Sequence, residues 1–167
     1  NGSYIFMAFA QDPDSTPATE ANSFEAKTYT GNGGTQSITL SNGMKPDFTW
    51  IKQKSGGASH SLQDTVRGAG QSKNIYSDNT ASEGTYGQYG YLSAFNTDGF
   101  TVVKGSGDHT NTSSSTYVSW NWKAADHDRD LATINQDGSI TSLVSANVAA
   151  GFSILSFTNG SSGTSTI

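Results

Sequence analysis

The chain of 167 residues contains no cysteine, which excludes disulfide bonds and metal sites built from thiolates. This absence leaves the redox compartment open. Only 14% of the residues are charged, and the net charge is −5. No cluster of Lys and Arg occurs. Binding to nucleic acid is therefore disfavoured, because its affinity comes from clustered cations that displace counterions from phosphates.

Long hydrophobic segments are also lacking. The longest apolar run, residues 4–10, is far shorter than the ~20 residues that a membrane-spanning helix requires. No basic segment precedes it, as one would in a signal peptide. The sequence therefore predicts no membrane insertion. The chain also begins without Met, and we interpret it as a fragment or a processed chain.

The chain is rich in small and polar residues. Ser, Thr, Asn and Gly together account for 76 of the 167 residues, and hydrophobic residues for 33%. Short alternating or aromatic-rich runs are separated by turn residues such as Gly, Asn and Asp, a pattern typical of antiparallel strands. The expected strands are 4–10, 24–30, 36–40, 48–53, 60–67, 73–77, 91–96, 100–104, 116–123 and 151–158. Their number and spacing predict an all-β fold, an antiparallel β-sandwich or jelly roll.

Two segments occur twice. The stretch FEAKTYTGNG at 24–33 returns in altered form as FSILSFTNGS at 152–161, and YIFMAFA at 4–10 has the shape of YVSWNWKA at 117–124. Along the chain, a closing-type segment, an opening-type segment, a closing-type segment and an opening-type segment follow one another, which indicates a section of a protein built from tandem repeats. We expect residues 1–10 to close a preceding unit, 11–23 and 125–150 to be linkers, 24–124 to be one complete β-sandwich unit, and 151–167 to open a following unit.

One acidic stretch partly fits a calcium-binding loop. Asp126, Asp128, Asp130 and Asp137 occupy the first, third, fifth and twelfth positions of that template. Leu131 stands where the template has the glycine of its sharp turn, and an Asp replaces its bidentate Glu. The sequence favours a solvated acidic linker, and we expect no metal and no cofactor.

One group of residues has the types needed for acid–base or nucleophilic chemistry: His60 and Asp64, with Ser59, Ser61 and Arg67 nearby. In a strand, residues four apart share a face, so His60 and Asp64 would align while Arg67 points away unless a bulge intervenes. We favour a framework role for Asp64 and Arg67, in which a strand-end arginine pairs with a carboxylate or caps loop carbonyls.

Glycoside hydrolysis would require two carboxylates across a cleft. The chain has only Glu20, Glu25 and Glu83 as glutamates, and no short-spaced acidic pair accompanies them. Catalysis is therefore the less favoured class of function, and we name no catalytic residue.

The segment EGTYGQYGY at 83–91 combines tyrosines with glycines. Sugar rings stack their apolar faces on aromatic side chains, while amide and carboxylate groups bind their hydroxyls. Tyr86 and Tyr89, with Gln88 between them, are therefore candidates for glycan binding. The alternative is that one or more tyrosines fold back as anchors of the loop.

Three tryptophans lie in predicted strands. Trp120 and Trp122 have the spacing of one strand face, and Trp50 lies in the strand expected at 48–53. We interpret all three as structural framework in the core.

The order of motifs resembles tandem β-sandwich domains in tail-fibre and virion-surface proteins of bacteriophages, especially marine ones. The resemblance covers the whole unit 24–124, and its flanks fit too. It rests on FEAKTYTGNG at 24–33, KPDFTWIK at 45–52, HSLQDTVRG at 60–68, NTDGF at 96–100 and YVSWNWKA at 117–124.

This resemblance implies a concanavalin-like sandwich that serves as a spacer or as a glycan-contacting module. We expect a noncatalytic virion surface protein, a tail fibre or decoration subunit, that helps to attach the particle to a host cell. Its expected partners are other virion subunits, further copies of itself and a cell-surface glycan. The alternatives are a bacterial extracellular adhesin or surface-polymer subunit, and a glycan-degrading enzyme.

Overall fold

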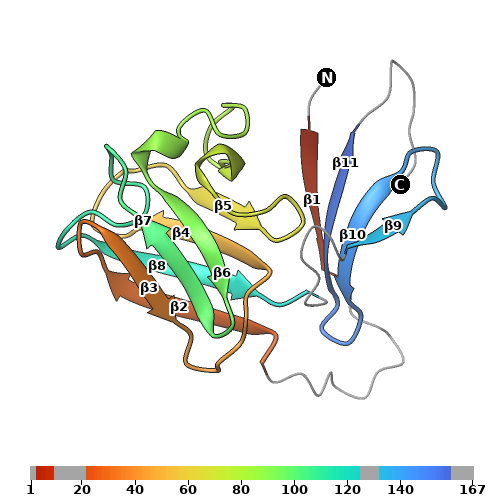
Figure 1. The fold of residues 1–167 in the computed structure, drawn as a ribbon, viewed down its shortest axis with the longest axis horizontal. Helices are drawn as coiled ribbons and strands as arrows, with labels where there is room; N and C mark the ends of the chain where they lie inside the picture. Colours follow the sequence, from red (N-terminus) through yellow and green to blue (C-terminus); the bar gives the residue numbers. More distant parts are fainter. Residues whose placement is uncertain (1–2, 10–21, 125–131, 159–167) are drawn as a thin grey trace.

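The computed structural model describes residues 3–9, 22–124 and 132–158, with the backbone alone described for 3–9. The regular secondary structure of the described residues is almost entirely antiparallel β-strand, which confirms the predicted all-β sandwich (Figure 1). The strands are β1 (Ser3–Phe9), β2 (Phe24–Thr30), β3 (Thr35–Thr39), β4 (Phe48–Gln53), β5 (Ser61–Asp64), β6 (Tyr91–Asn96), β7 (Gly99–Val103), β8 (Thr116–Trp122), β9 (Thr133–Asn135), β10 (Ser142–Asn147) and β11 (Phe152–Thr158). Two short 3-10 helices, η1 (Gln71–Lys73) and η2 (Gly87–Tyr89), lie between β5 and β6.

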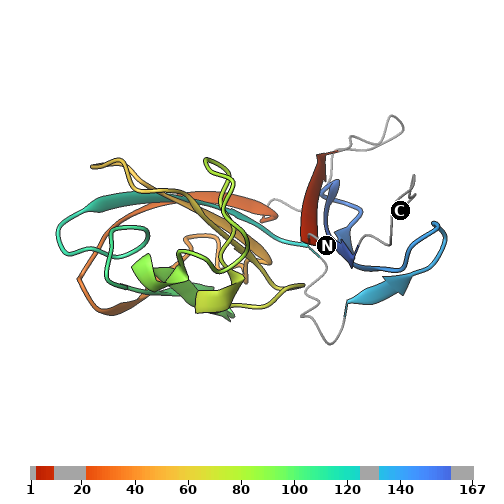
Figure 2. The same cartoon turned by 90° about the horizontal axis from the view of Figure 1, so that it is seen from above.

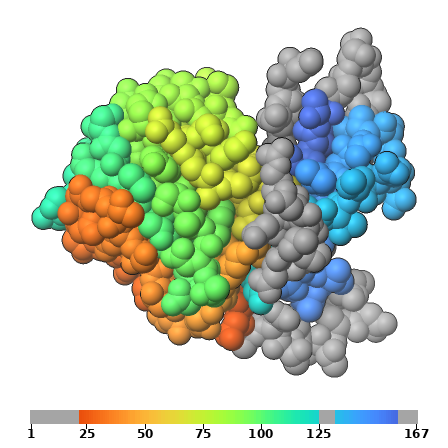
Figure 3. Space-filling model, in the orientation of Figure 1, coloured from red at the N-terminus to blue at the C-terminus, as the bar shows by residue number. Residues whose placement is uncertain are grey.

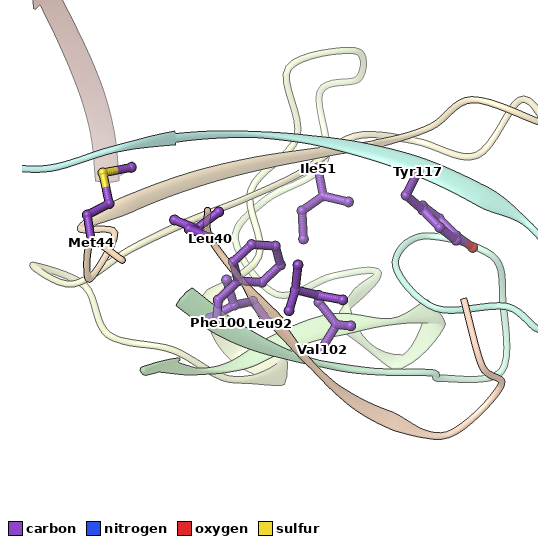
Figure 4. Packing of buried hydrophobic residues seen from close by; sticks show 8 residues of the cluster. Leu40, Met44, Ile51, Leu92, Phe100, Val102 and Tyr117 are labelled. Carbon is purple, nitrogen blue, oxygen red and sulfur yellow. The ribbon is translucent and has the colours of Figure 1, made fainter. Parts of the chain in front are cut away.

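Two sheets form the central sandwich. One has the strand order β2-β8-β4-β5 and the other β3-β7-β6, and Figure 2 shows them as two layers. The core between them contains Ile51 and Tyr117 from the first sheet and Ile38, Leu92, Phe100 and Val102 from the second, joined by Leu40 and Met44 from the connection between β3 and β4. Figure 4 shows these side chains pointing toward one another from the two layers. Their burial supplies the main apolar driving force for the sandwich.

The side chains of strand β8 alternate between two faces, as predicted, but the face that is buried between the sheets is the one without the tryptophans. Its fully buried face carries Tyr117, Ser119 and Asn121, whereas Trp120 and Trp122 are only partly buried on the opposite face. The tryptophans therefore lie outside the main core cluster. The sheet tolerates a buried polar face because its groups are hydrogen-bonded: Asn121 Oδ1 accepts from Thr49 Oγ1 at 3.1 Å, and Asn121 Nδ2 donates to Ser119 Oγ at 3.0 Å.

A further sheet, β1-β11-β10-β9, stands beside the sandwich (Figure 1). Phe152 of β11 is 4% exposed, and its ring centroid lies 6.0 Å from that of Trp122 and 6.4 Å from that of Phe48. Together with Ile154, these residues belong to a second hydrophobic cluster. The outer face of the first sheet, with its partly buried tryptophan, is thus the surface on which the additional sheet docks.

The two repeated segments pair in the same way. β2 and β8 are antiparallel and place Phe24 opposite Trp122; β11 and β1 are antiparallel and place Phe152 opposite Phe9. Each pairing extends over seven residues. Within this chain, the segment expected to open one unit therefore pairs with the segment expected to close another.

The boundaries expected around the central unit differ in part from the structure. The segment 125–150, interpreted as a linker, contains β9 and β10, which complete the sheet with β11. Most of the other expected linker, 11–23, lies outside the described residues. The division of the chain into tandem units stays a prediction.

The strand expected at 60–67 is shorter in the structure. β5 ends at Asp64 because two hydrogen bonds close a turn there. The Asp64 side-chain carboxylate accepts the backbone N–H of Arg67 at 2.8 Å, and the Asp64 backbone carbonyl accepts the backbone N–H of Gly68 at 2.9 Å. The strand expected at 73–77 is reduced to an isolated bridge between Leu62 and Ile75, and the chain then continues into the loops that carry the tyrosines.

Candidate functional site

The segment between β5 and β6 is tied to the sandwich through a buried amide. Asn74 is fully buried, and its Oδ1 accepts from Ser61 Oγ at 2.6 Å and from Gln63 Nε2 at 2.5 Å. Its Nδ2 donates to the Gly90 carbonyl at 3.0 Å. One side chain thus joins β5 to the end of the tyrosine loop, and both the oxygen and the nitrogen of its amide are hydrogen-bonded.

A second anchor is Arg67. Its Nε donates to Asp64 Oδ2 at 2.6 Å, and its Nη1 donates to Glu83 Oε1 at 2.9 Å and to the Lys73 carbonyl at 2.8 Å. Asp64 is fully buried, whereas the Glu83 side chain is 31% exposed. The structure therefore brings Asp64 and Arg67 together as a strand-end pair, and the guanidinium also fixes the start of the tyrosine loop.

Glycines allow the two halves of this segment to approach each other. A Cβ built at Gly87 would overlap the Gln71 carbonyl, and one built at Gly84 would lie 2.8 Å from the Ser72 carbonyl oxygen. Gly84 also has a φ of 75°, which L-residues with side chains rarely adopt. η2 therefore packs closely on η1, and the loop has a defined shape.

Four rings gather at this loop. Tyr86 and Tyr89 stack with centroids 5.8 Å apart and an interplanar angle of 25°. Tyr76 meets Tyr86 edge to face at 5.6 Å, and His109 meets Tyr89 edge to face at 5.5 Å. Tyr76 and His109 also meet edge to face, with ring centroids 6.0 Å apart. We call these four residues the tyrosine cluster.

The cluster has a buried layer and an exposed layer. Tyr76 and His109 are 9% and 8% exposed, whereas Tyr86 and Tyr89 are each 37% exposed. The Tyr76 hydroxyl accepts the backbone N–H of Tyr86 at 3.0 Å. The segment that bears the outer rings, coloured yellow-green, lies at the surface of the sandwich away from β9–β11 (Figure 3). Two solvent-facing rings thus rest on two buried ones.

Burial shifts the titration of the inner layer. It raises the pKa of the Tyr76 hydroxyl, although the hydrogen bond from the Tyr86 backbone acts against it. Burial lowers the pKa of His109, although the negative charges of Asp78 and Asp108 act against it. At neutral pH both inner rings are therefore uncharged, and they offer the outer tyrosines an apolar support.

The candidate residues Tyr86, Gln88 and Tyr89 are brought together by η2. The Gln88 side chain is exposed, while the Gln88 backbone carbonyl accepts the backbone N–H of Ser106 at 2.8 Å. Gln88 therefore lies between the two stacking tyrosines in the sequence of η2, with its backbone fixed and its side chain exposed to solvent. Apolar ring faces beside an amide form the combination that binds a sugar.

The tryptophans form a different aromatic group. Trp50 and Trp120 meet edge to face at 5.7 Å, and Trp50 Nε1 donates to His60 Nδ1 at 2.9 Å. Ser77 Oγ lies 2.7 Å from the same nitrogen. His60 therefore supports Trp50 on the outer face of the sheet, while Asp64 is engaged with Arg67.

The carboxylates expected as catalytic alternatives are occupied by structural bonds. Asp64 and Glu83 bind the same guanidinium. Glu25 accepts the backbone N–H groups of Ser41 and Asn42, both at 2.8 Å, and so closes the turn between β3 and β4. Glu20 lies outside the described residues.

Burial raises the pKa of Glu25, but its hydrogen bonds from Ser41 and Asn42 and the charge of Lys27 outweigh this and lower it overall. A general acid needs the opposite shift. The Glu25 carboxylate is thus suited to holding the turn.

The described residues contain no group of three or more His, Cys, Asp or Glu side chains placed to bind a metal ion. Asp126, Asp128 and Asp130 of the calcium-like motif lie outside the described residues. In the part of the chain that the structure describes, no helix is long and apolar enough to cross a membrane.

Sequence reasoning missed the inner layer of the cluster. Tyr76 precedes the loop in a short irregular segment, and His109 follows β7 in a run of polar residues. The strand expected at 73–77 includes Tyr76, but nothing in the local sequence links it to His109, because their contact joins distant parts of the chain.

No curated protein and no solved structure matches the chain. One family does match, over residues 19–167, which include the central sandwich, the tyrosine cluster and the strands β9 to β11. Its description is a domain of unknown function. Since this match covers most of the sequence, the chain belongs to the DUF7483 family.

Proposed function

We propose that this chain is a noncatalytic surface module that binds a glycan through Tyr86, Gln88 and Tyr89. The observation that carries the proposal is the tyrosine cluster, in which two stacked, half-exposed rings rest on two buried rings. A platform of this kind loses little conformational entropy on binding, because its shape is already fixed by glycine contacts and by the Arg67–Glu83 ion pair.

The expected contact is weak for a single site. Pairs of aromatic side chains gain about 0.5–1.5 kcal/mol beyond their buried area; we take the same order of magnitude for a sugar ring stacked on a tyrosine, and the platform offers two rings and one amide. Linked or assembled copies turn such contacts into strong attachment, because each further binding event becomes intramolecular. The module is therefore suited to a repetitive surface.

We place this module at the surface of a virion, in a tail fibre or decoration protein that contributes to host attachment. The support is the order of sequence motifs that resembles bacteriophage fibre domains, together with the all-β sandwich. Other virion subunits and further copies of this chain are the expected partners. No cofactor enters this function.

A hydrolytic function is less well supported. Asp64 is fully buried and Glu83 is paired, and both bind Arg67. A pair of catalytic carboxylates has to flank the bond to be cleaved, whereas these two flank a guanidinium.

The test is binding of the chain, presented multivalently, to an array of bacterial surface glycans. We expect Tyr86→Ala and Tyr89→Ala to weaken binding by about two- to tenfold each, from the stacking energy per ring. The double variant should lose it. Tyr86→Phe and Tyr89→Phe retain the rings and separate stacking from hydrogen bonding by the hydroxyls.

Phe24→Ala is the matched control, because Phe24 is an aromatic residue that is 48% exposed on a strand outside the cluster. It should bind as the wild type does. Absence of binding to any glycan, or equal loss in the control and in the folded double variant, would remove the proposal and favour a spacer role.

A further inference from the structure

His109 lies beneath the proposed glycan platform. Its imidazole is 8% exposed and makes edge-to-face contacts with Tyr89 at 5.5 Å and with Tyr76 at 6.0 Å. Its backbone N–H donates to the Tyr89 carbonyl at 3.3 Å. A Cβ added at Gly90, the residue after η2, would lie 3.5 Å from the His109 Cβ. His109 is thus packed against the backbone of Tyr89 and Gly90 as well as against the Tyr89 ring.

One nitrogen of this imidazole has no partner among the described residues. His109 Nδ1 is buried and accepts or donates no hydrogen bond there. The imidazolium form carries a proton on both ring nitrogens. Protonation would therefore leave a charged donor buried without an acceptor, which is far more costly than a neutral ring at the same place.

The charged groups that act on His109 lie toward solvent. Asp108 precedes it in the same loop and accepts from Thr112 Oγ1 at 2.7 Å, and Asp78 lies in the segment after Tyr76. Both aspartates are exposed. The groups packed against the imidazole itself are the neutral rings of Tyr76 and Tyr89. A protonated His109 thus gains most by turning out of the cluster toward water and the two carboxylates.

We propose that His109 is the positioning residue of the tyrosine platform and makes it pH-dependent, so that protonation of its imidazole releases Tyr89 and weakens glycan binding. This inference rests on the proposed function, because the ligand is taken to bind at that platform. Neutral His109 fills the space behind Tyr89 and holds the outer pair stacked.

The direction in pH follows from the burial. A histidine whose pKa is lowered in the competent state is neutral there and becomes protonated as the pH falls through that pKa, below the ordinary value of about 6.5. If only the neutral form binds, affinity falls about tenfold for each pH unit below the pKa. Binding therefore persists at neutral pH and is lost as the pH falls through this lowered pKa.

The first experiment needs no ligand. Aromatic ring signals of His109 and Tyr89 are followed by NMR from pH 7.5 to pH 5 in the folded chain. We expect the Tyr89 ring to change environment with the same midpoint as the His109 imidazole. A Tyr89 ring that stays unchanged while His109 titrates, or a His109 that does not titrate in this range, overturns the inference.

The second experiment measures binding of the array-selected glycan over the same pH range. Wild type should lose affinity toward pH 5, while His109→Phe, which keeps a ring in place and cannot be protonated, should bind without this pH dependence. His60→Gln is the matched control and should retain the wild-type pH dependence, because His60 lies beside Trp50 and outside the cluster.

The two proposals can fail separately. If no glycan binds at any pH but the Tyr89 ring follows His109, the proposed ligand is wrong and the coupling within the cluster stands. If a glycan binds and its affinity is the same at pH 7.5 and pH 5, or if His109→Phe keeps the wild-type pH profile, the inference on His109 is wrong and the platform stands.

Discussion

Arg67 offers the sharpest test of how the tyrosine loop is held. Its guanidinium binds a fully buried carboxylate, Asp64, on one side and a partly exposed one, Glu83, on the other. The two ion pairs use different nitrogens of one guanidinium and differ in their exposure to solvent. Removing Arg67 should therefore have a far larger effect than removing the charge of Glu83.

The magnitudes follow from burial. Arg67→Met leaves Asp64 buried without its cation, and breaking such a pair costs about 3–5 kcal/mol of unfolding free energy. Asp64 retains the bond from the backbone N–H of residue 67, which places the expected loss near the lower end, at about 3 kcal/mol. Glu83→Gln keeps an acceptor for Nη1 in a partly exposed pair and should cost less than about 1 kcal/mol.

The assay is urea-induced unfolding followed by far-ultraviolet circular dichroism and tryptophan fluorescence. Asp64→Leu combined with Arg67→Met serves as the second comparison, because it removes the unpaired charge and should recover part of the stability. Equal losses in Arg67→Met and Glu83→Gln, or a loss below about 1 kcal/mol in Arg67→Met, would refute the reasoning from burial.

Two further predictions concern the docked sheet and the turn at Glu25. Phe152→Ala removes a ring that packs on Trp122, so β10 and β11 should become sensitive to protease while the central sandwich stays resistant; unchanged resistance would contradict the docking. Because the pKa of Glu25 is lowered in the fold, its contribution to stability is present above the ordinary carboxyl pKa of about 4.3 and is lost as the pH falls through the lowered one. Melting temperatures between pH 3 and pH 7 should therefore fall less steeply in Glu25→Gln than in wild type, and parallel curves would exclude this role.

The strand pattern was predictable where alternation is strong. Strands were expected at 24–30, 48–53 and 91–96, and β2, β4 and β6 occupy these ranges. The reason is that alternating side chains and Gly-Asn turns are local features of the sequence. The all-β sandwich follows from their number.

The choice of face was not predictable from hydrophobicity alone. On β8 the tryptophans lie on the outer face, where Trp122 packs on Phe152 of the docked sheet, while Ser119 and Asn121 are buried between the layers. Burial of such polar groups depends on partners such as Thr49, which is 72 residues away from Asn121 in the sequence. No local pattern contains that information.

The site was predictable only in its exposed half. Tyr86 and Tyr89 stand out beside glycines, whereas Tyr76 and His109 become neighbours only through the fold. β10 falls within the expected linker 125–150, because SLVSAN at 142–147 is a weakly apolar segment that becomes a strand through pairing with β11.

The most direct test of the central claim is NMR mapping of aromatic side chains while an array-selected oligosaccharide is added at neutral pH. The account predicts that the ring signals of Tyr86 and Tyr89 shift first and saturate together, while those of Trp50 and Trp120 stay unchanged. Shifts at the tryptophans with unchanged tyrosines would contradict it, because the glycan would then bind to the outer face of the sheet and leave the platform empty.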